Sequence, residues 1–298
     1  MSVYVGRLAP SPTGHVHLGI ARTSLVAWLD ARHHGGQLLM RVEDIDGPRT
    51  VEGAADSILA DLEWLGLDWD GAPTLQSRRA EPYAAALEHL AALGRTFPCT
   101  CSRKQIREAS APHGPTARYP GTCRDRTEPY GDRAPAIRLR TEPRDVFEHT
   151  DAVLGHIEQN VHDAVGDFVL KRSDGLWAYQ LAVTVDDLAQ GVTCIVRGAD
   201  LFDSTPRQLL LRSLLEPDTP PPESVHVPLV VDAEGKRLAK RHRAQPIRTL
   251  GETPERIVGA LARSLNLTTE AAIRPEELLS SYDRARLPTT PTALADDA

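Results

Sequence analysis

The first stretch that could do chemistry spans residues 7–20 and reads Arg7-Leu8-Ala9-Pro10-Ser11-Pro12-Thr13-Gly14-His15-Val16-His17-Leu18-Gly19-Ile20. A short apolar strand precedes it, two prolines and Gly14 predict a turn, and a helical pattern begins near Leu18. The start of a helix directs free backbone N–H groups and the positive end of the helix dipole toward a ligand, which suits phosphate. His15 and His17, beside Gly19, could therefore bind a triphosphate. The alternative is a proline-rich loop with surface histidines.

Carboxylates follow the next expected strand. His34-Gly35-Gly36 interrupts the helical pattern, and residues 37–43 read as a buried strand. Strand, helix and strand in this order predict a parallel sheet, in which ligands bind at the carboxyl ends of the strands. Glu43, Asp44 and Asp46 lie at that end. A solvated loop is the alternative, but the position favours a site role for at least one of them.

Three cysteines could form a metal site. Cys99-Thr100-Cys101 is followed by a loop rich in proline, glycine and arginine, and then by Cys123. Closely spaced thiolates are ligands that zinc prefers in a tetrahedral site, and the fourth ligand could come from His113 or Tyr119. The alternative is a group of free buried thiols.

Length, composition and charge restrict the class of protein. The chain has 298 residues, is 41% hydrophobic and 25% charged, and carries a formal net charge of −7, which excludes a generally nucleic-acid-attracting surface but not a local basic face. No stretch is apolar enough to span a membrane, and no signal peptide is recognisable. Four cysteines without an export signal indicate reduced thiols or a metal. These features predict a cytoplasmic protein with no membrane partner.

Later segments repeat the strand-and-helix pattern. Helices are expected over 50–65 and around 83–93, and a strand at 190–200 precedes a helix that begins at Ser204. This second unit mirrors the first, as in a nucleotide-binding sheet split by an insertion. Beyond a basic run at 236–241, which is most often just a solvated surface, we expect a helix over 254–267 and another near 275–282.

Two motifs resemble signatures of the class I glutamyl- and glutaminyl-type aminoacyl-tRNA synthetases. Pro-Ser-Pro-Thr-Gly-x-x-His-x-Gly is similar to their first signature, with Ile20 in place of a second histidine. Residues 237–241, Arg-Leu-Ala-Lys-Arg, stand where the family has Lys-Met-Ser-Lys-Ser, so that Lys240 is retained. The resemblance implies an α/β fold in which an inserted α+β domain with zinc splits a Rossmann-like parallel sheet.

The resemblance also implies roles for individual residues. The catalytic residues are His17 and Lys240. Two guanidinium groups suit a substrate with two carboxylates, and residue types alone do not decide which arginine binds the side-chain carboxylate. The glutamate site comprises Arg7, Ala9, Ser11, Glu43, Tyr179 and Arg197, and the ATP site comprises His17, Gly19, Arg237, Leu238 and Lys240.

The glutamyl-queuosine branch of this family has a Cys-x-Cys…Tyr-x₃-Cys zinc site, which matches Cys99, Cys101, Tyr119 and Cys123. Its implied activity is ATP-dependent activation of L-glutamate, with Mg²⁺ bound through ATP, and transfer of the glutamyl group to the queuosine base in the anticodon of tRNA(Asp). A monomer is expected. The alternatives are a truncated glutamyl-tRNA synthetase that charges the 3′ end of tRNA(Glu), and a catalytically weak tRNA-binding paralogue.

These expectations divide the chain into five parts. The two halves of the catalytic domain occupy 1–94 and 165–245, and the inserted domain with the zinc site occupies 95–164. A helical segment at 246–286 and a disordered tail at 287–298 complete the chain. Only residues 242–298 follow the basic run, which is too little for a helical anticodon-binding domain.

Overall fold

A computed structural model describes residues 3–102, 104–106, 118–126, 134–231 and 246–293. Within these ranges, no helix is both long enough and apolar enough to cross a membrane.

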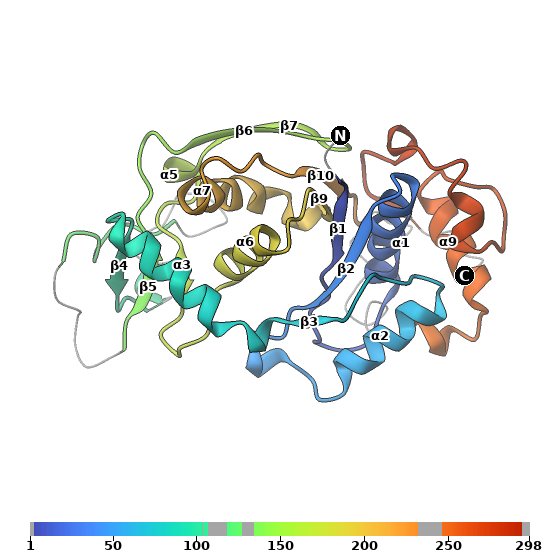
Figure 1. The fold of residues 1–298 in the computed structure, drawn as a ribbon, viewed down its shortest axis with the longest axis horizontal. Coiled ribbons are helices and arrows are strands. Elements are labelled where there is room, and N and C mark those ends of the chain that lie inside the picture. Colours follow the sequence, from blue (N-terminus) through green and yellow to red (C-terminus); the bar gives the residue numbers. More distant parts are fainter. Residues whose placement is uncertain (1–2, 103, 107–117, 127–133, 232–245, 294–298) are drawn as a thin grey trace.

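Parallel strands form the centre of the fold (Figure 1). One sheet has the order β1-β2-β3, and a second pairs β9 with β10, all in parallel. A backbone hydrogen bond from Thr193 N to Val5 O, 2.9 Å long, joins the edges of the two sheets, so that β9 lies beside β1. The strands are β1 (Val5–Leu8), β2 (Gln37–Val42), β3 (Thr74–Leu75), β9 (Cys194–Gly198) and β10 (Glu223–Val227).

Helices cover both faces of this layer because the side chains of a strand alternate between its two faces. Leu8, Leu38 and Met40 face α1 (Leu18–His33) and belong to the main hydrophobic core. Arg7 and Arg41 point to the opposite face, where α6 (Tyr179–Ala189) provides Asp187. Outside these helices, α9 (Pro254–Ser264) packs on α1, and α7 (Thr205–Leu215) packs on α6.

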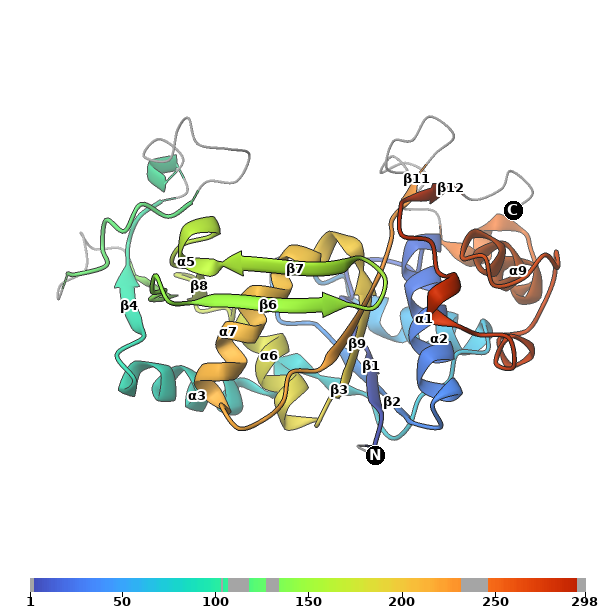
Figure 2. The same cartoon turned by 90° about the horizontal axis from the view of Figure 1, so that it is seen from above.

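A second group of strands lies at the other end of the molecule from α9 (Figure 2). β4 (Thr96–Cys99), β5 (Ala136–Leu139) and β8 (Val169–Lys171) form an antiparallel sheet. A hairpin of β6 (Val146–Asp151) and β7 (Gly155–Asn160) crosses α7 and brings its turn to β10. Helices α3 (Ala80–Ala92) and α5 (Val161–Ala164) also lie in this part of the molecule.

Several expected boundaries are wrong. α2 spans Ala54–Trp64 rather than starting near Thr50, because Gly53 adopts a left-handed φ of 75° at its N-cap. The helix expected over 254–267 ends at Ser264, as α9. β10 is followed by β11 (Val230–Val231), with Pro228 between the two strands. The 3₁₀ helices are η1 (Gly47–Arg49), η2 (Gln76–Arg78), η3 (Ala199–Ser204), η4 (Ile247–Leu250), η5 (Pro275–Leu278) and η6 (Arg284–Arg286).

The expected disordered tail is also wrong for residues 287–293. Leu287 is buried in the main core, and β12 (Thr292–Ala293) pairs in parallel with β11. Arg22, buried in α1, donates to Thr292 Oγ1 at 2.7 Å. These residues are held by contacts with β11 and α1. Both elements lie far away in the sequence, so the composition of the chain end does not reveal these contacts. Residues 294–298 lie outside the described ranges.

Candidate active site and metal centre

A cavity of about 620 Å³ opens at the carboxyl ends of β1, β2 and β9, beside the N-terminus of α1. This is the edge at which open parallel sheets bind ligands. Every predicted glutamate- or ATP-site residue in the described part of the chain lines this one cavity: Arg7, Ala9, Ser11, His17, Gly19, Glu43, Tyr179 and Arg197. Residues from both halves of the sequence therefore meet there.

Buried charges lie along one wall of the cavity. Asp187 Oδ1 accepts from Arg41 Nη1 at 2.8 Å and from Arg7 Nε at 3.3 Å. Burial alone would raise the pKa of Asp187, but Arg41 and Arg7 hold it below its usual range. The charge of Arg7 is thus balanced by a carboxylate of the protein itself.

Glu43 lies at the cavity end of the same group. Its Oε1 accepts from Arg41 Nη2 at 3.3 Å. Burial raises the pKa of Glu43 above its ordinary value, although Arg41 and Arg7 oppose the shift. A ligand ammonium group at this carboxylate would favour its ionised form.

Arg197 has a different environment. Its guanidinium donates to His226 Nε2 at 2.8 Å, to Gln208 Oε1 at 2.7 Å and to Thr205 Oγ1 at 2.9 Å. All three acceptors are neutral. Burial lowers the pKa of Arg197 and raises that of Tyr179, which lies near it. Tyr179 is the first residue of α6.

His17 caps α1. Its Nδ1 accepts from Ile20 N at 3.3 Å, which satisfies one of the free N–H groups of the first turn. A Cβ on Gly19 would lie 3.2 Å from two atoms of the His17 ring. Glycine at this position therefore leaves room for the imidazole at the helix start, which explains the His-x-Gly spacing physically.

The predicted second signature is not located by the structure. Arg237, Leu238 and Lys240 lie within 232–245, outside the described residues. Val230, shortly before this segment, lines the cavity. Their assignment to the ATP site stays a prediction.

The three cysteines form a compact group. The Sγ atoms of Cys99, Cys101 and Cys123 lie within 4.8 Å of one another, and those of Cys101 and Cys123 are 3.5 Å apart. A tetrahedral zinc with Zn–S bonds near 2.3 Å holds its sulfurs about 3.8 Å apart. Burial raises the pKa of the Cys101 thiol to about 11, so that binding a cation there must displace protons.

Tyr119 occupies the fourth position of this group. Its hydroxyl lies 3.4 Å from Cys99 Sγ and 3.9 Å from Cys101 Sγ. A zinc-bound oxygen would lie about 3.5 Å from each sulfur of the same tetrahedron. The donor set therefore fits zinc. His113, the other predicted candidate, lies outside the described residues.

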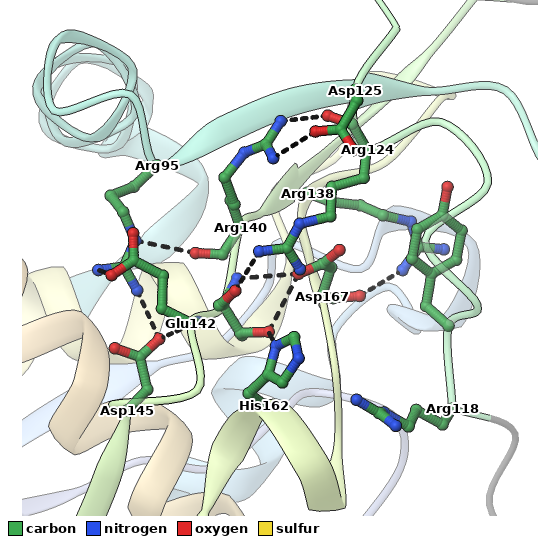
Figure 3. A network of polar contacts seen from close by, with 12 residues as sticks. Arg95, Arg118, Arg124, Asp125, Arg138, Arg140, Glu142, Asp145, His162 and Asp167 are labelled. Atoms are coloured by element: carbon green, nitrogen blue, oxygen red, sulfur yellow. Dashed lines mark hydrogen bonds and ion pairs between the residues drawn. The ribbon is translucent and has the colours of Figure 1, made fainter.

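Arginine side chains link the loop that carries Tyr119 and Cys123 to neighbouring segments through hydrogen bonds and ion pairs (Figure 3). Arg124 forms an ion pair with Asp167 at 2.8 Å, and Asp167 also accepts from Thr141 N. Arg138 donates to Asp167 O, and its guanidinium stacks 4.0 Å from the centre of the Tyr119 ring. The loop thus has a fixed position that does not depend on the cysteines alone.

Sequence reasoning missed the residues that hold the cavity residues in place. Arg41, Asp187, Gln208 and His226 are buried polar side chains. The available signal was a charged or polar residue inside an apolar run, as for Arg41 in β2 and His226 in β10. Such a residue requires a partner when buried, but the sequence does not name the partner.

Comparison with known proteins agrees with this geometry. A family model described as the catalytic domain of class I tRNA synthetases (E and Q) matches residues 3–287. A glutamyl-Q tRNA(Asp) synthetase of Nitratidesulfovibrio vulgaris is 48% identical over 98% of this chain and 96% of the relative. One of Nocardia farcinica is 47% identical, over 98% of this chain and 93% of the relative. The chain belongs to the glutamyl-Q tRNA(Asp) synthetase family.

Solved structures agree at the level of the fold. A glutamate tRNA ligase from Elizabethkingia meningosepticum, determined in complex with its amino acid, superposes with a TM-score of 0.85 at 24% identity. The match covers 99% of this chain and 67% of that chain. The predicted class I synthetase fold with a parallel sheet is confirmed. The division into an inserted domain and the absence of an anticodon-binding domain stay predictions.

Proposed function

We propose that this chain activates L-glutamate with ATP and transfers the glutamyl group to the queuosine base of tRNA(Asp). The observation that carries the proposal is the single cavity, in which Arg7, Glu43, Tyr179 and Arg197 lie beside His17 at the start of α1. An acidic amino acid and a phosphate chain would thus bind next to each other. The names of the relatives at 47–48% identity support glutamate and queuosine tRNA as substrates.

The charges of the cavity suit glutamate. Glu43 would bind the ammonium group in a charge-assisted hydrogen bond. Arg197 is buried among neutral acceptors, and a substrate carboxylate would supply the missing negative charge. Arg7 is already paired with Asp187, so Arg197 is the better candidate for the side-chain carboxylate.

The proposed reaction has two steps. In the first, the α-carboxylate of glutamate attacks the α-phosphate of ATP, and glutamyl-adenylate forms as pyrophosphate leaves. His17 and Lys240 would stabilise the charge that develops on the phosphates. In the second, a hydroxyl of queuosine attacks the adenylate carbonyl and releases AMP. Mg²⁺ bound to ATP would offset the charge of its phosphates.

We further propose that residues 95–164 form an inserted domain whose zinc is held by Cys99, Cys101, Tyr119 and Cys123. The fit of these donors to a tetrahedral site supports the metal. Zinc there would stabilise a loop that faces the tRNA. We also propose that the chain acts as a monomer, and that it acts in the cytoplasm, where its tRNA and ATP substrates are found.

Exchange of pyrophosphate into ATP tests the activation step. We expect exchange with L-glutamate, and little with L-glutamine or L-aspartate. Glu43→Gln should abolish it, whereas Asp44→Asn should not, because Asp44 follows the same strand but bonds Ser77 and does not line the cavity. Failure of glutamate to support exchange, with and without tRNA, would overturn the proposal.

A further inference from the structure

The Arg197 guanidinium is held by a chain of buried groups that no predicted role uses. Arg197 is only 5% exposed, and within the described ranges it forms no ion pair. Its acceptors His226, Gln208 and Thr205 are uncharged. Arg7 and Arg41, in the same cavity wall, share Asp187 instead. The contrast raises the question of what fixes the orientation of Arg197.

His226 fixes this orientation, because its tautomer is determined by its two hydrogen-bond partners. The Nε of arginine is always a donor, so His226 Nε2, at 2.8 Å, must be the acceptor and carries no proton. The ring proton is therefore on Nδ1, where Asp151 Oδ2 lies 2.6 Å away. The imidazole is fully buried, and the Phe202 ring packs edge-on against it at 5.2 Å.

Asp151 is itself held in place. Its Oδ1 accepts from Val153 N at 3.0 Å and from Leu154 N at 2.9 Å, and its Oδ2 accepts from Ser224 Oγ at 2.8 Å. Asp151 is the last residue of β6, and the turn of this hairpin lies beside β10, the strand that carries His226 (Figure 2). A distant segment thus supports the cavity.

We infer that Asp151 and His226 are positioning residues that orient Arg197 for a substrate carboxylate while leaving its charge unbalanced. A carboxylate in direct contact would orient the guanidinium too, but it would also neutralise the charge that the substrate must meet. A neutral imidazole separates Asp151 from Arg197 and avoids this. The pair would therefore favour glutamate over glutamine. This inference rests on the proposed function.

Kinetics of three variants test the inference. We expect His226→Phe to raise KM for glutamate at least tenfold in pyrophosphate exchange and to leave KM for ATP within twofold. Discrimination against glutamine should fall in parallel. His226→Gln keeps an acceptor for Arg197 and should recover most of the loss, and Asp151→Asn should lie between the two. His149→Gln is the matched control, because His149 is on the same hairpin and bonds Ser224 but not Arg197.

A spectroscopic measurement gives a second readout that does not depend on turnover. Nitrogen-15 NMR of histidine-labelled protein, with His226→Gln for assignment, should show His226 as the neutral Nδ1–H tautomer at pH 7. An Nε2–H tautomer or an imidazolium would overturn the inference, as would a normal KM for glutamate in His226→Phe. If the wild type neither binds nor activates glutamate, the proposed function fails first, and the inference fails with it.

Discussion

Arg7 and Arg197 line one cavity but differ in what balances their charge. Arg7 is paired with Asp187, whereas Arg197 contacts His226, Gln208 and Thr205. A buried cation that lacks a counter-charge gains most from an anionic ligand. At the scale of single residues, selectivity for an acidic substrate therefore depends on Arg197.

Arg197→Lys tests this role. Lysine keeps the charge but loses the planar set of donors, and a hydrogen bond to a charged group contributes about 1.5–3 kcal/mol. We expect KM for glutamate in pyrophosphate exchange to rise about 10- to 150-fold, since each 1.4 kcal/mol is about tenfold. The control is Arg212→Lys, a buried arginine of α7 that does not line the main cavity. Equal losses in both variants would contradict the assignment.

Gly19→Ala tests the placement of His17. The added Cβ would lie 3.2 Å from the imidazole and push the ring away from the helix start. Because a displacement of about 1 Å at a reacting group can cost about 100-fold, we expect kcat for exchange to fall by up to that factor. Gly47→Ala, where an added Cβ meets nothing within 4 Å, should have normal kcat. A normal kcat in Gly19→Ala would contradict the dependence of His17 placement on this glycine.

At the scale of elements, the loop between β4 and β5 carries the predicted metal site. Cys123→Ser should reduce bound zinc from one per chain to a small fraction, as measured by elemental analysis of the purified protein. Tyr119→Phe keeps the three sulfurs and should weaken zinc retention against a chelator. Cys194→Ser is the control, because Cys194 lies in β9 and bonds Asp30. Full zinc content in Cys123→Ser would refute the site.

Some elements could be predicted from the sequence and others could not. The turn and helix after β1 have strong local signals, namely two prolines, Gly14 and an apolar helical pattern. The β6–β7 hairpin has only weak local signals, because both of its strands contain charged and polar side chains. Its location depends on Asp151, whose partner His226 is 75 residues away.

The residues of the candidate site also differ in how well the sequence predicts them. Those within motifs, such as His17, Gly19 and Glu43, could be named from the sequence, and the cysteine spacing predicted the group at the metal site. The supporting pairs could not, because Arg41 and Asp187 are 146 residues apart and neither belongs to a motif. Only the fold reveals which buried charge balances which.

At the scale of the whole molecule, Asp30 joins the two ends of the described chain. It is fully buried in α1 and accepts from Tyr4 Oη, Tyr282 Oη and Arg284. Burial would raise its pKa, but hydrogen bonds and the charge of Arg284 hold the pKa below the usual range. This one carboxylate connects the residue that precedes β1, the first helix and the C-terminal segment.

Asp30→Asn should therefore destabilise the protein by about 3–5 kcal/mol in urea unfolding at pH 7, because it leaves Arg284 without its buried partner. The native pKa of Asp30 is depressed, so its contribution is complete above the unfolded value of about 3.9 and is lost as pH falls through the native value. The difference between wild type and variant should be constant from pH 7 to pH 5 and shrink below about pH 4. A difference that is constant throughout would contradict this account.

Transfer of radiolabelled glutamate to tRNA(Asp) tests the central claim most directly. The comparison uses queuosine-containing tRNA(Asp), the same tRNA from cells that lack queuosine, and queuosine-containing tRNA(Asp) without its 3′-terminal adenosine. We predict label on both queuosine-containing tRNAs and none on the unmodified one. Label on tRNA(Glu) that disappears when its terminal adenosine is removed would contradict the account and identify a charging enzyme instead.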